Sequence, residues 1–131
     1  MSSRLVLIVE DSPHMAANLE IALSMVPDVE VRVADSGADA LRVLDDEPGA
    51  FVAAVITDLE MPRMNGFDLI AKLRANPKFA RLPIIVSSGS TDPDSPDRAR
   101  RLGADAYFTK PYSPAALRRK LEQLIQEEKD G

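Results

Sequence analysis

Five short runs of strand type alternate along this 131-residue chain with five segments whose apolar residues recur at helical spacing. The expected strands are residues 5–9, 29–33, 51–56, 82–88 and 105–109. The first and third runs are apolar throughout and too short for a buried helix, which is typical of strands covered on both faces. Strands that alternate with helices in this way form a parallel sheet with helices packed against it.

Serine and proline mark the starts of three expected helices. Ser12-Pro13, Ser95-Pro96 and Ser113-Pro114 each place a capping serine before a proline, which is favoured in the first helical turn. We expect the helix that follows Ser95 to be short and to end at Gly103, about two turns later, because prolines interrupt the preceding loop.

Five strand–helix units of this length predict a flavodoxin-like fold, an α/β doubly wound parallel sheet of order 2-1-3-4-5 with helices on both faces. The second strand alternates apolar and polar residues, as edge strands do. The length and the 45% hydrophobic content suit one domain over residues 1–131. We expect its core at about 4–125 and a frayed tail at 126–131.

Chemistry-bearing residues follow four of these strands. Glu10 and Asp11 follow the first strand, Asp58 the third, Ser88 ends the fourth, and Lys110 follows the fifth. In an open α/β sheet the carboxyl ends of the strands form the ligand-binding edge. Taken singly, each is equally an ordinary loop residue. Together, at one edge, they predict a functional site.

Three carboxylates brought together repel one another unless their pKa values rise or a cation neutralises them. Oxygen ligands from two or three protein groups, completed by water, suit Mg²⁺ better than Ca²⁺, and no His or Cys set suits zinc. Beside such a cation, one carboxylate can attack phosphorus while an ammonium stabilises the equatorial oxygens. We therefore expect Asp58 to be the nucleophile and Lys110 its counter-charge.

The composition excludes several other classes of function. The chain has no cysteine, which excludes disulfides and thiolate sites and agrees with a reducing compartment. Its net charge of -5 argues against direct nucleic-acid binding. No run approaches the roughly 20 apolar residues of a membrane span, so we expect a cytoplasmic protein without membrane insertion.

With these residues in place, the chain resembles the response-regulator receiver domain, the phosphoacceptor module of two-component signalling and of single-domain chemotaxis regulators. The resemblance runs from about residue 4 to 124 and rests on the motifs VED at 9–11, DLEMPRMNG at 58–66, LPIIVSSG at 82–89, GADAY at 103–107 and KP at 110–111. The acidic pair alone is a weak signal, whereas the whole set in this order is specific.

The resemblance implies that Asp58 receives a phosphoryl group from a sensor histidine kinase or a histidine phosphotransferase. It implies Mg²⁺ bound by Asp11, Asp58 and the backbone carbonyl of Glu60, with Glu10 acting through water. Ser88 would hydrogen-bond the phosphate and Lys110 would pair with it. Such a protein catalyses only its own phosphorylation and dephosphorylation and is not otherwise an enzyme.

The resemblance also implies a switch. Phosphorylation would draw Ser88 inward, Tyr107 would turn into the vacated space, and the face of helix four, strand five and helix five would signal to a partner. Without the resemblance, Tyr107 reads equally well as a partly buried strand aromatic. Lys110-Pro111 matches the family's cis peptide position. The downstream target and a phosphorylation-dependent dimer stay open.

Two alternative functions remain at this stage. A phosphatase of the haloacid-dehalogenase type has the same ingredients, but its nucleophile follows the first strand in an Asp-x-Asp arrangement, where this chain has Glu10-Asp11. A receiver-fold scaffold that accepts no phosphate is the other, although the complete acceptor set is present. His14 and the arginines at 98, 100 and 101 are interpreted as surface residues, and the Glu60 side chain as a group able to alter the lifetime of the phosphoryl group.

Overall fold

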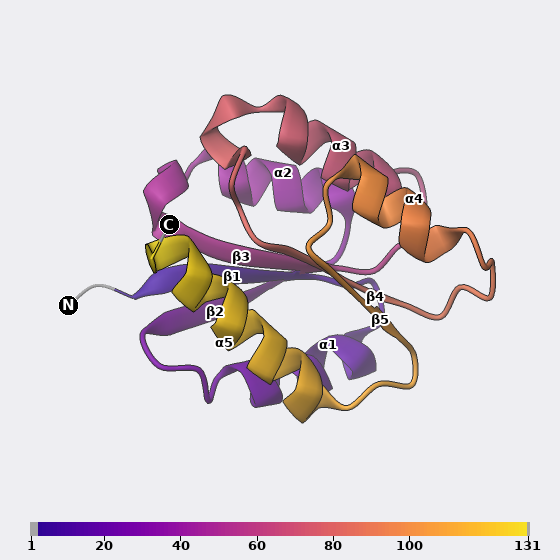
Figure 1. Ribbon diagram of the computed structural model, residues 1–131, viewed down its shortest axis with the longest axis horizontal. Coiled ribbons are helices and arrows are strands. Elements are labelled where there is room, and N and C mark those ends of the chain that lie inside the picture. Colours follow the sequence, from indigo (N-terminus) through magenta and orange to yellow (C-terminus); the bar gives the residue numbers. More distant parts are fainter. Residues whose placement is uncertain (1–2, 131) are drawn as a thin grey trace.

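The computed structural model describes residues 3–130, and its five strands form one parallel sheet in the order β2-β1-β3-β4-β5 (Figure 1). This is the predicted flavodoxin-like topology, which is confirmed. The strands are β1 (Arg4–Val9), β2 (Val29–Ala34), β3 (Val52–Thr57), β4 (Ile84–Ser88) and β5 (Ala106–Thr109). The helices are α1 (Pro13–Leu23), α2 (Gly37–Asp45), α3 (Gly66–Ala75), α4 (Ser95–Leu102) and α5 (Pro114–Asp130), with short 3-10 turns η1 (Gly49–Phe51) and η2 (Pro77–Phe79).

Helices cover both faces of the sheet. In Figure 1, α2, α3 and α4 lie on one side, and α1 and α5 lie on the other. Successive residues of a strand point to opposite faces, so Leu5 and Leu7 join the core under the first group while Val6 and Ile8 join the core under the second. Within residues 3–130, no helix combines the length and the apolar character that a membrane crossing requires.

The depth of each strand explains its sequence pattern. All six residues of β3 are buried, as its unbroken apolar run predicts. Strand β2 lies at the edge, and its polar residues Glu30 and Arg32 are exposed. The register pairs Val9 with Thr57 across β1 and β3, so the residues that follow these two strands emerge side by side.

Two helix starts agree with the serine–proline signals and one differs. Ser12 Oγ accepts a hydrogen bond from Met15 N at 3.4 Å, and Ser113 Oγ accepts one from Ala116 N at 3.2 Å. In α4, however, Asp94 is the cap and Ser95 is the first helical residue, with its buried side chain in contact with another hydroxyl. The helix has the expected two-turn length, eight residues, and ends at Gly103, whose φ is 119°.

The last helix extends beyond the core boundary expected near residue 125. Helix α5 continues to Asp130, so most of the tail expected at 126–131 is helical, and Gly131 lies outside the described residues. Arg4 contributes to this order, because its guanidinium contacts Glu128 at 2.9 Å while it also donates to the carbonyl oxygen of Val52 at 3.1 Å. An ion pair between residues 124 positions apart was not visible in the local sequence pattern.

Candidate functional site

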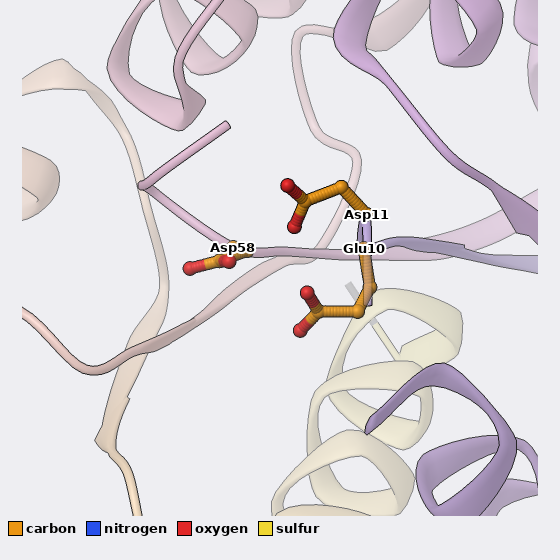
Figure 2. A group of neighbouring side chains, drawn as sticks. All are labelled: Glu10, Asp11 and Asp58. Carbon is orange, nitrogen blue, oxygen red and sulfur yellow. The ribbon is translucent and has the colours of Figure 1, made fainter. Parts of the chain in front are cut away.

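Three carboxylates meet at the carboxyl edge of the sheet (Figure 2). Glu10 and Asp11 follow β1, Asp58 follows β3, and one oxygen atom from each lies within 4.8 Å of the others. Figure 2 shows all three side chains turned toward the same side of the strand ends. The predicted convergence of these acids is therefore confirmed.

The backbone holds two of these acids rigidly. Asp58 N donates to Val9 O at 3.0 Å, and Glu10 N donates to Ala34 O at 3.0 Å, which extends the sheet pairing by one residue at the site. Glu10 is 6% exposed and Asp58 5%, whereas Asp11 is exposed. The site therefore has two buried carboxylates and one that faces solvent.

Lys110 is the cation of the site. Its Nζ lies 2.9 Å from Glu10 Oε1 and 3.5 Å from Asp58 Oδ2, so its shorter contact is with Glu10 rather than with the expected Asp58. Lys110 N also donates to Ser88 O at 2.7 Å, and the peptide bond to Pro111 is cis, as the resemblance implied. Burial lowers the pKa of the ammonium, but the hydrogen bond to Glu10 and the charge of Asp58 outweigh it, and the pKa lies above 10.5.

The pKa of the Glu10 carboxyl is raised, chiefly by burial. Burial raises the pKa of its carboxyl above the usual 4.5, and the charge of Asp58 adds to this, although hydrogen bonds from Lys110 and Ser12 act in the opposite direction. The fold thus disfavours ionisation of Glu10 even with an ammonium in contact. A further cation bound beside Glu10 would favour its ionised form.

We expect Glu10→Gln to stabilise the metal-free protein increasingly as the pH rises from about 4.5 to the raised pKa of the folded-state carboxyl, and by a constant amount above it. The wild-type carboxyl is protonated below about pH 4.5 in both states, whereas ionising it at higher pH costs more in the folded state than in the unfolded state. Chemical denaturation in EDTA at several pH values measures the difference in unfolding free energy. If the stability advantage of Glu10→Gln over the wild type became smaller as the pH rose, the pKa of Glu10 would not be raised in the folded protein.

The remaining predicted residues are Ser88, Glu60 and Tyr107, which differ in their burial. Ser88 is fully buried at the end of β4, and its Oγ accepts a hydrogen bond from Ser90 N at 3.0 Å. Glu60 is exposed, and its backbone N–H donates to Asp58 Oδ1 at 3.3 Å. Tyr107 is half-buried, and its hydroxyl oxygen has no hydrogen-bond partner among the described residues although it is shielded from solvent.

Two further residues lie close to the site: Tyr112, which the sequence analysis did not single out, and Gly66, the last residue of the motif at 58–66. Tyr112 lies near the site, where burial raises the pKa of its phenol while the charge of Lys110 opposes the shift. Its position two residues after Lys110 was the only indication in the sequence that it lies near the site. Gly66 packs directly against the backbone of Asp58 and Leu59. His14, by contrast, is exposed and its ring contacts Asn18 at 3.5 Å, which agrees with a surface role.

The predicted surface arginines have local contacts. The guanidinium of Arg98 lies 4.1 Å from the ring centroid of Phe67, and Arg100 pairs with Asp97 at 2.9 Å. All three arginines of α4, Arg101 included, are exposed. Their placement agrees with the interpretation of a solvated helix surface.

The donor set of the acidic cluster fits a hard divalent cation. Its three ligand atoms are all carboxylate oxygens, and among them only those of Asp11 face solvent freely. Mg²⁺ takes a small number of carboxylates and keeps several waters, which matches a site with one open side. The cluster can therefore hold a metal ion next to the Asp58 carboxylate.

Comparison with known proteins agrees with this geometry. The sequence profile of the response regulator receiver domain matches residues 6–122. Chemotaxis protein CheY1 of Helicobacter pylori is 34% identical over 119 residues, which cover 91% of this chain and 94% of that protein. The sensor histidine kinase TmoS of Ectopseudomonas mendocina is 39% identical over 122 residues, which cover 92% of this chain and 12% of that kinase.

Solved structures share the fold over nearly the whole chain. The signal receiver domain of a histidine kinase from Syntrophus aciditrophicus superposes with a TM-score of 0.87 at 29% identity, covering 98% of this chain and 95% of that one. Chemotaxis protein CheY4 of Vibrio cholerae gives a TM-score of 0.82 at 25% identity, covering 94% and 99%. The chain therefore belongs to the family of response regulator receiver domains, the phosphoacceptor modules of two-component signalling.

Proposed function

We propose that Asp58 is the phosphoacceptor of this receiver domain. The observation that carries the proposal is the Asp58 carboxylate, which is 5% exposed, grouped with those of Glu10 and Asp11, and 3.5 Å from Lys110 Nζ. A buried carboxylate held by the sheet next to a cation site is oriented for attack on phosphorus. Neither the phosphatase nor the scaffold alternative is favoured by the family membership of the chain.

The donor in this proposal is the phosphohistidine of a sensor kinase or of a histidine phosphotransferase. An Asp58 carboxylate oxygen forms the new P–O bond as the P–N bond to the donor breaks, and the donor imidazole keeps the electron pair and is protonated. Lys110 pairs with the equatorial oxygens, and the Ser88 hydroxyl donates to one of them.

The proposed metal is Mg²⁺, held by the carboxylates of Asp11 and Asp58 and the backbone carbonyl of Glu60, with Glu10 contributing through water. When bound, Mg²⁺ supplies neutralisation of the charge that develops on the phosphoryl oxygens. The cluster geometry supports the carboxylate part of this ligand set. The role of the Glu60 carbonyl rests on the family resemblance.

Ser88 and Tyr107 would change conformation on phosphorylation and so transmit the signal from the site to the surface. A phosphoryl group adds a charge of about -1.5 to -2 and three acceptor oxygens, which attract the Ser88 hydroxyl. The Tyr107 hydroxyl has no partner within residues 3–130 in this conformation, which supports a second orientation of the ring in which it finds one. The face formed by α4, β5 and α5 would then present a changed surface to a downstream protein.

We expect Mg²⁺ to raise the free energy of unfolding by about 2.7 kcal/mol at 100 times its dissociation constant. Asp11→Asn should weaken binding by about tenfold or more, since it removes a charged oxygen ligand. Thermal unfolding across a Mg²⁺ titration measures both effects. Asp35→Asn is the matched control, because Asp35 is exposed after β2 at the same sheet edge but outside the cluster.

Mass spectrometry of the intact protein after incubation with acetyl phosphate and Mg²⁺ tests the proposed function. The expected result is a single phosphoryl addition that depends on Mg²⁺, decays slowly, and maps to the peptide that contains Asp58. Repeated turnover of acetyl phosphate without a stable adduct would instead support the phosphatase. Absence of any addition would support the scaffold and would overturn the proposal.

A further inference from the structure

Side chains, rather than backbone pairing, shape most of the loop that leads from β4 to α4. Ser88 Oγ accepts a hydrogen bond from Ser90 N at 3.0 Å, Ser90 Oγ accepts one from Asp92 N at 3.2 Å, and Asp92 Oδ1 accepts one from Asp94 N at 2.9 Å. Each bond joins a side-chain oxygen to the backbone two residues later, as in serine and aspartate turns. We call this series the 88–94 ladder. It begins at a buried residue of the site and ends at the residue that precedes α4.

The 88–94 ladder is also joined directly to the helix. Ser90 Oγ lies 3.1 Å from Ser95 Oγ, and Ser95 is the first residue of α4 and only 4% exposed. Asp94, the N-cap residue, makes no side-chain capping bond. The hydroxyl of Ser90 therefore contributes both to the ladder and to the placement of the first turn of α4.

The opposite end of α4 is held by a different kind of contact. The Arg74 guanidinium donates from Nε and Nη2 to Gly103 O at 3.1 and 2.8 Å, and Nη2 lies 3.2 Å from Asp105 Oδ2. Asp105 in turn accepts a hydrogen bond from Ile84 N at 2.9 Å. Charge-assisted bonds of this kind are about twice as strong as bonds between neutral groups. Helix α4 is thus anchored to α3 and to the start of β4 at its C-terminal end.

Because the contacts at its two ends differ, a movement of the Ser88 side chain would affect the N-terminal end of α4 and not its C-terminal end. Ser88 Oγ accepts the Ser90 bond through a lone pair, so the hydroxyl proton stays available for another acceptor. A phosphoryl oxygen forms a stronger, charge-assisted bond with that proton. When Ser88 turns toward it, the first bond of the ladder is strained or lost, while the anchored end at Gly103 is unaffected.

We propose that Ser90 is the positioning residue that couples Ser88 to the N-terminal end of α4, so that this end moves about the fixed Arg74–Gly103 contact when Asp58 carries a phosphoryl group. The inference rests on the proposed function and specifies its regulation. Ser90 is suited to this role because one oxygen serves Asp92 N and Ser95 Oγ together. Alanine at this position has no oxygen to make either contact, whereas threonine retains one.

Hydrogen exchange of backbone amides with and without phosphoryl loading tests the proposal. Acetyl phosphate with Mg²⁺ loads the protein, and intact mass gives the loaded fraction of each sample. In the wild type, loading should speed exchange at the amides of Ser95 and Arg98, which donate to Asp92 O and Asp94 O, by about fivefold, the ratio expected for one neutral hydrogen bond, and leave residues 103–106 unchanged. Ser90→Ala should load equally. Its amides at Ser95 and Arg98 should exchange faster before loading and change less than about twofold on loading.

Two further variants separate coupling from general loosening. Ser90→Thr should restore the wild-type response. Ser113→Ala removes a comparable serine bond, from Ala116 N at the start of α5, and should leave the response of α4 intact. A wild-type response in fully loaded Ser90→Ala, or failure of Ser90→Thr to restore it, would overturn the inference alone. A wild-type protein that takes up no phosphoryl group would overturn the proposed function itself, and the inference with it.

Discussion

The Asp58→Asn variant is expected to take up no phosphoryl group from acetyl phosphate and Mg²⁺ under conditions that load the wild type. An amide has no anionic oxygen to form the P–O bond, and neither other acid of the cluster replaces it in position. Asp11 is exposed, and the Glu10 carboxylate is engaged at 2.9 Å by Lys110 and at 3.2 Å by Ser12 N. Intact mass after incubation measures the result.

The matched control for this variant is Asp46→Asn. Asp46 is an exposed carboxylate that follows α2, so the substitution changes the net charge equally without touching the cluster. It should load like the wild type. A persistent phosphoryl addition in Asp58→Asn, mapped to another residue, would show that the acceptor has been assigned to the wrong carboxylate.

The Gly66→Ala variant is expected to lose about 2–3 kcal/mol of unfolding free energy and to phosphorylate poorly. A Cβ at this position would lie 2.8 Å from Leu59 Cα and 2.9 Å from Leu59 Cδ2, and it would also meet the carbonyl oxygen of Asp58. Gly66 N donates to Leu59 O at 2.9 Å, so the start of α3 cannot move away without breaking that bond. The displacement would therefore pass to the backbone that carries the nucleophile.

Gly89→Ala is the control for this substitution, because it adds the same methyl group at another glycine near the site. There the nearest neighbour is Glu60 Oε1 at 3.8 Å, an ordinary contact, and the stability should change by less than about 0.5 kcal/mol. Urea unfolding and phosphoryl uptake measured on both variants give the comparison. If the two variants were equally stable, the backbone around Asp58 would be able to move and accommodate the added methyl group, which would contradict this prediction.

The order of the strands was predictable because burial acts on every residue of a strand. The unbroken apolar run of β3 and the alternating pattern of β2 report how deeply each strand lies, and right-handed crossovers then leave few topologies. The convergence of Glu10, Asp11 and Asp58 followed from that order, since adjacent parallel strands end at one edge. Most of the site was therefore a consequence of the topology.

Contacts between side chains were less predictable. Lys110 lies nearer to Glu10 than to Asp58, a difference of tenths of an ångström that depends on the register between strands far apart in the chain. Ser95 looked like a helix cap by its sequence, but its side chain is buried against Ser90 and it opens the helix instead. The local pattern was the same as at Ser12 and Ser113, which do cap, so only the packing around each serine distinguishes them.

Local preferences could be read directly from the sequence: which residues form strands, where serine and proline start helices, and which acids follow which strands. These depend on periodicity and on backbone chemistry within a few residues. The partner of each charged or hydroxyl group became apparent only in the folded protein, as for the Arg74 contact with Gly103 and the contact that joins the 88–94 ladder to α4. These side-chain contacts depend on distances between segments that are far apart in the chain, and those distances are determined only when the helices pack against the sheet.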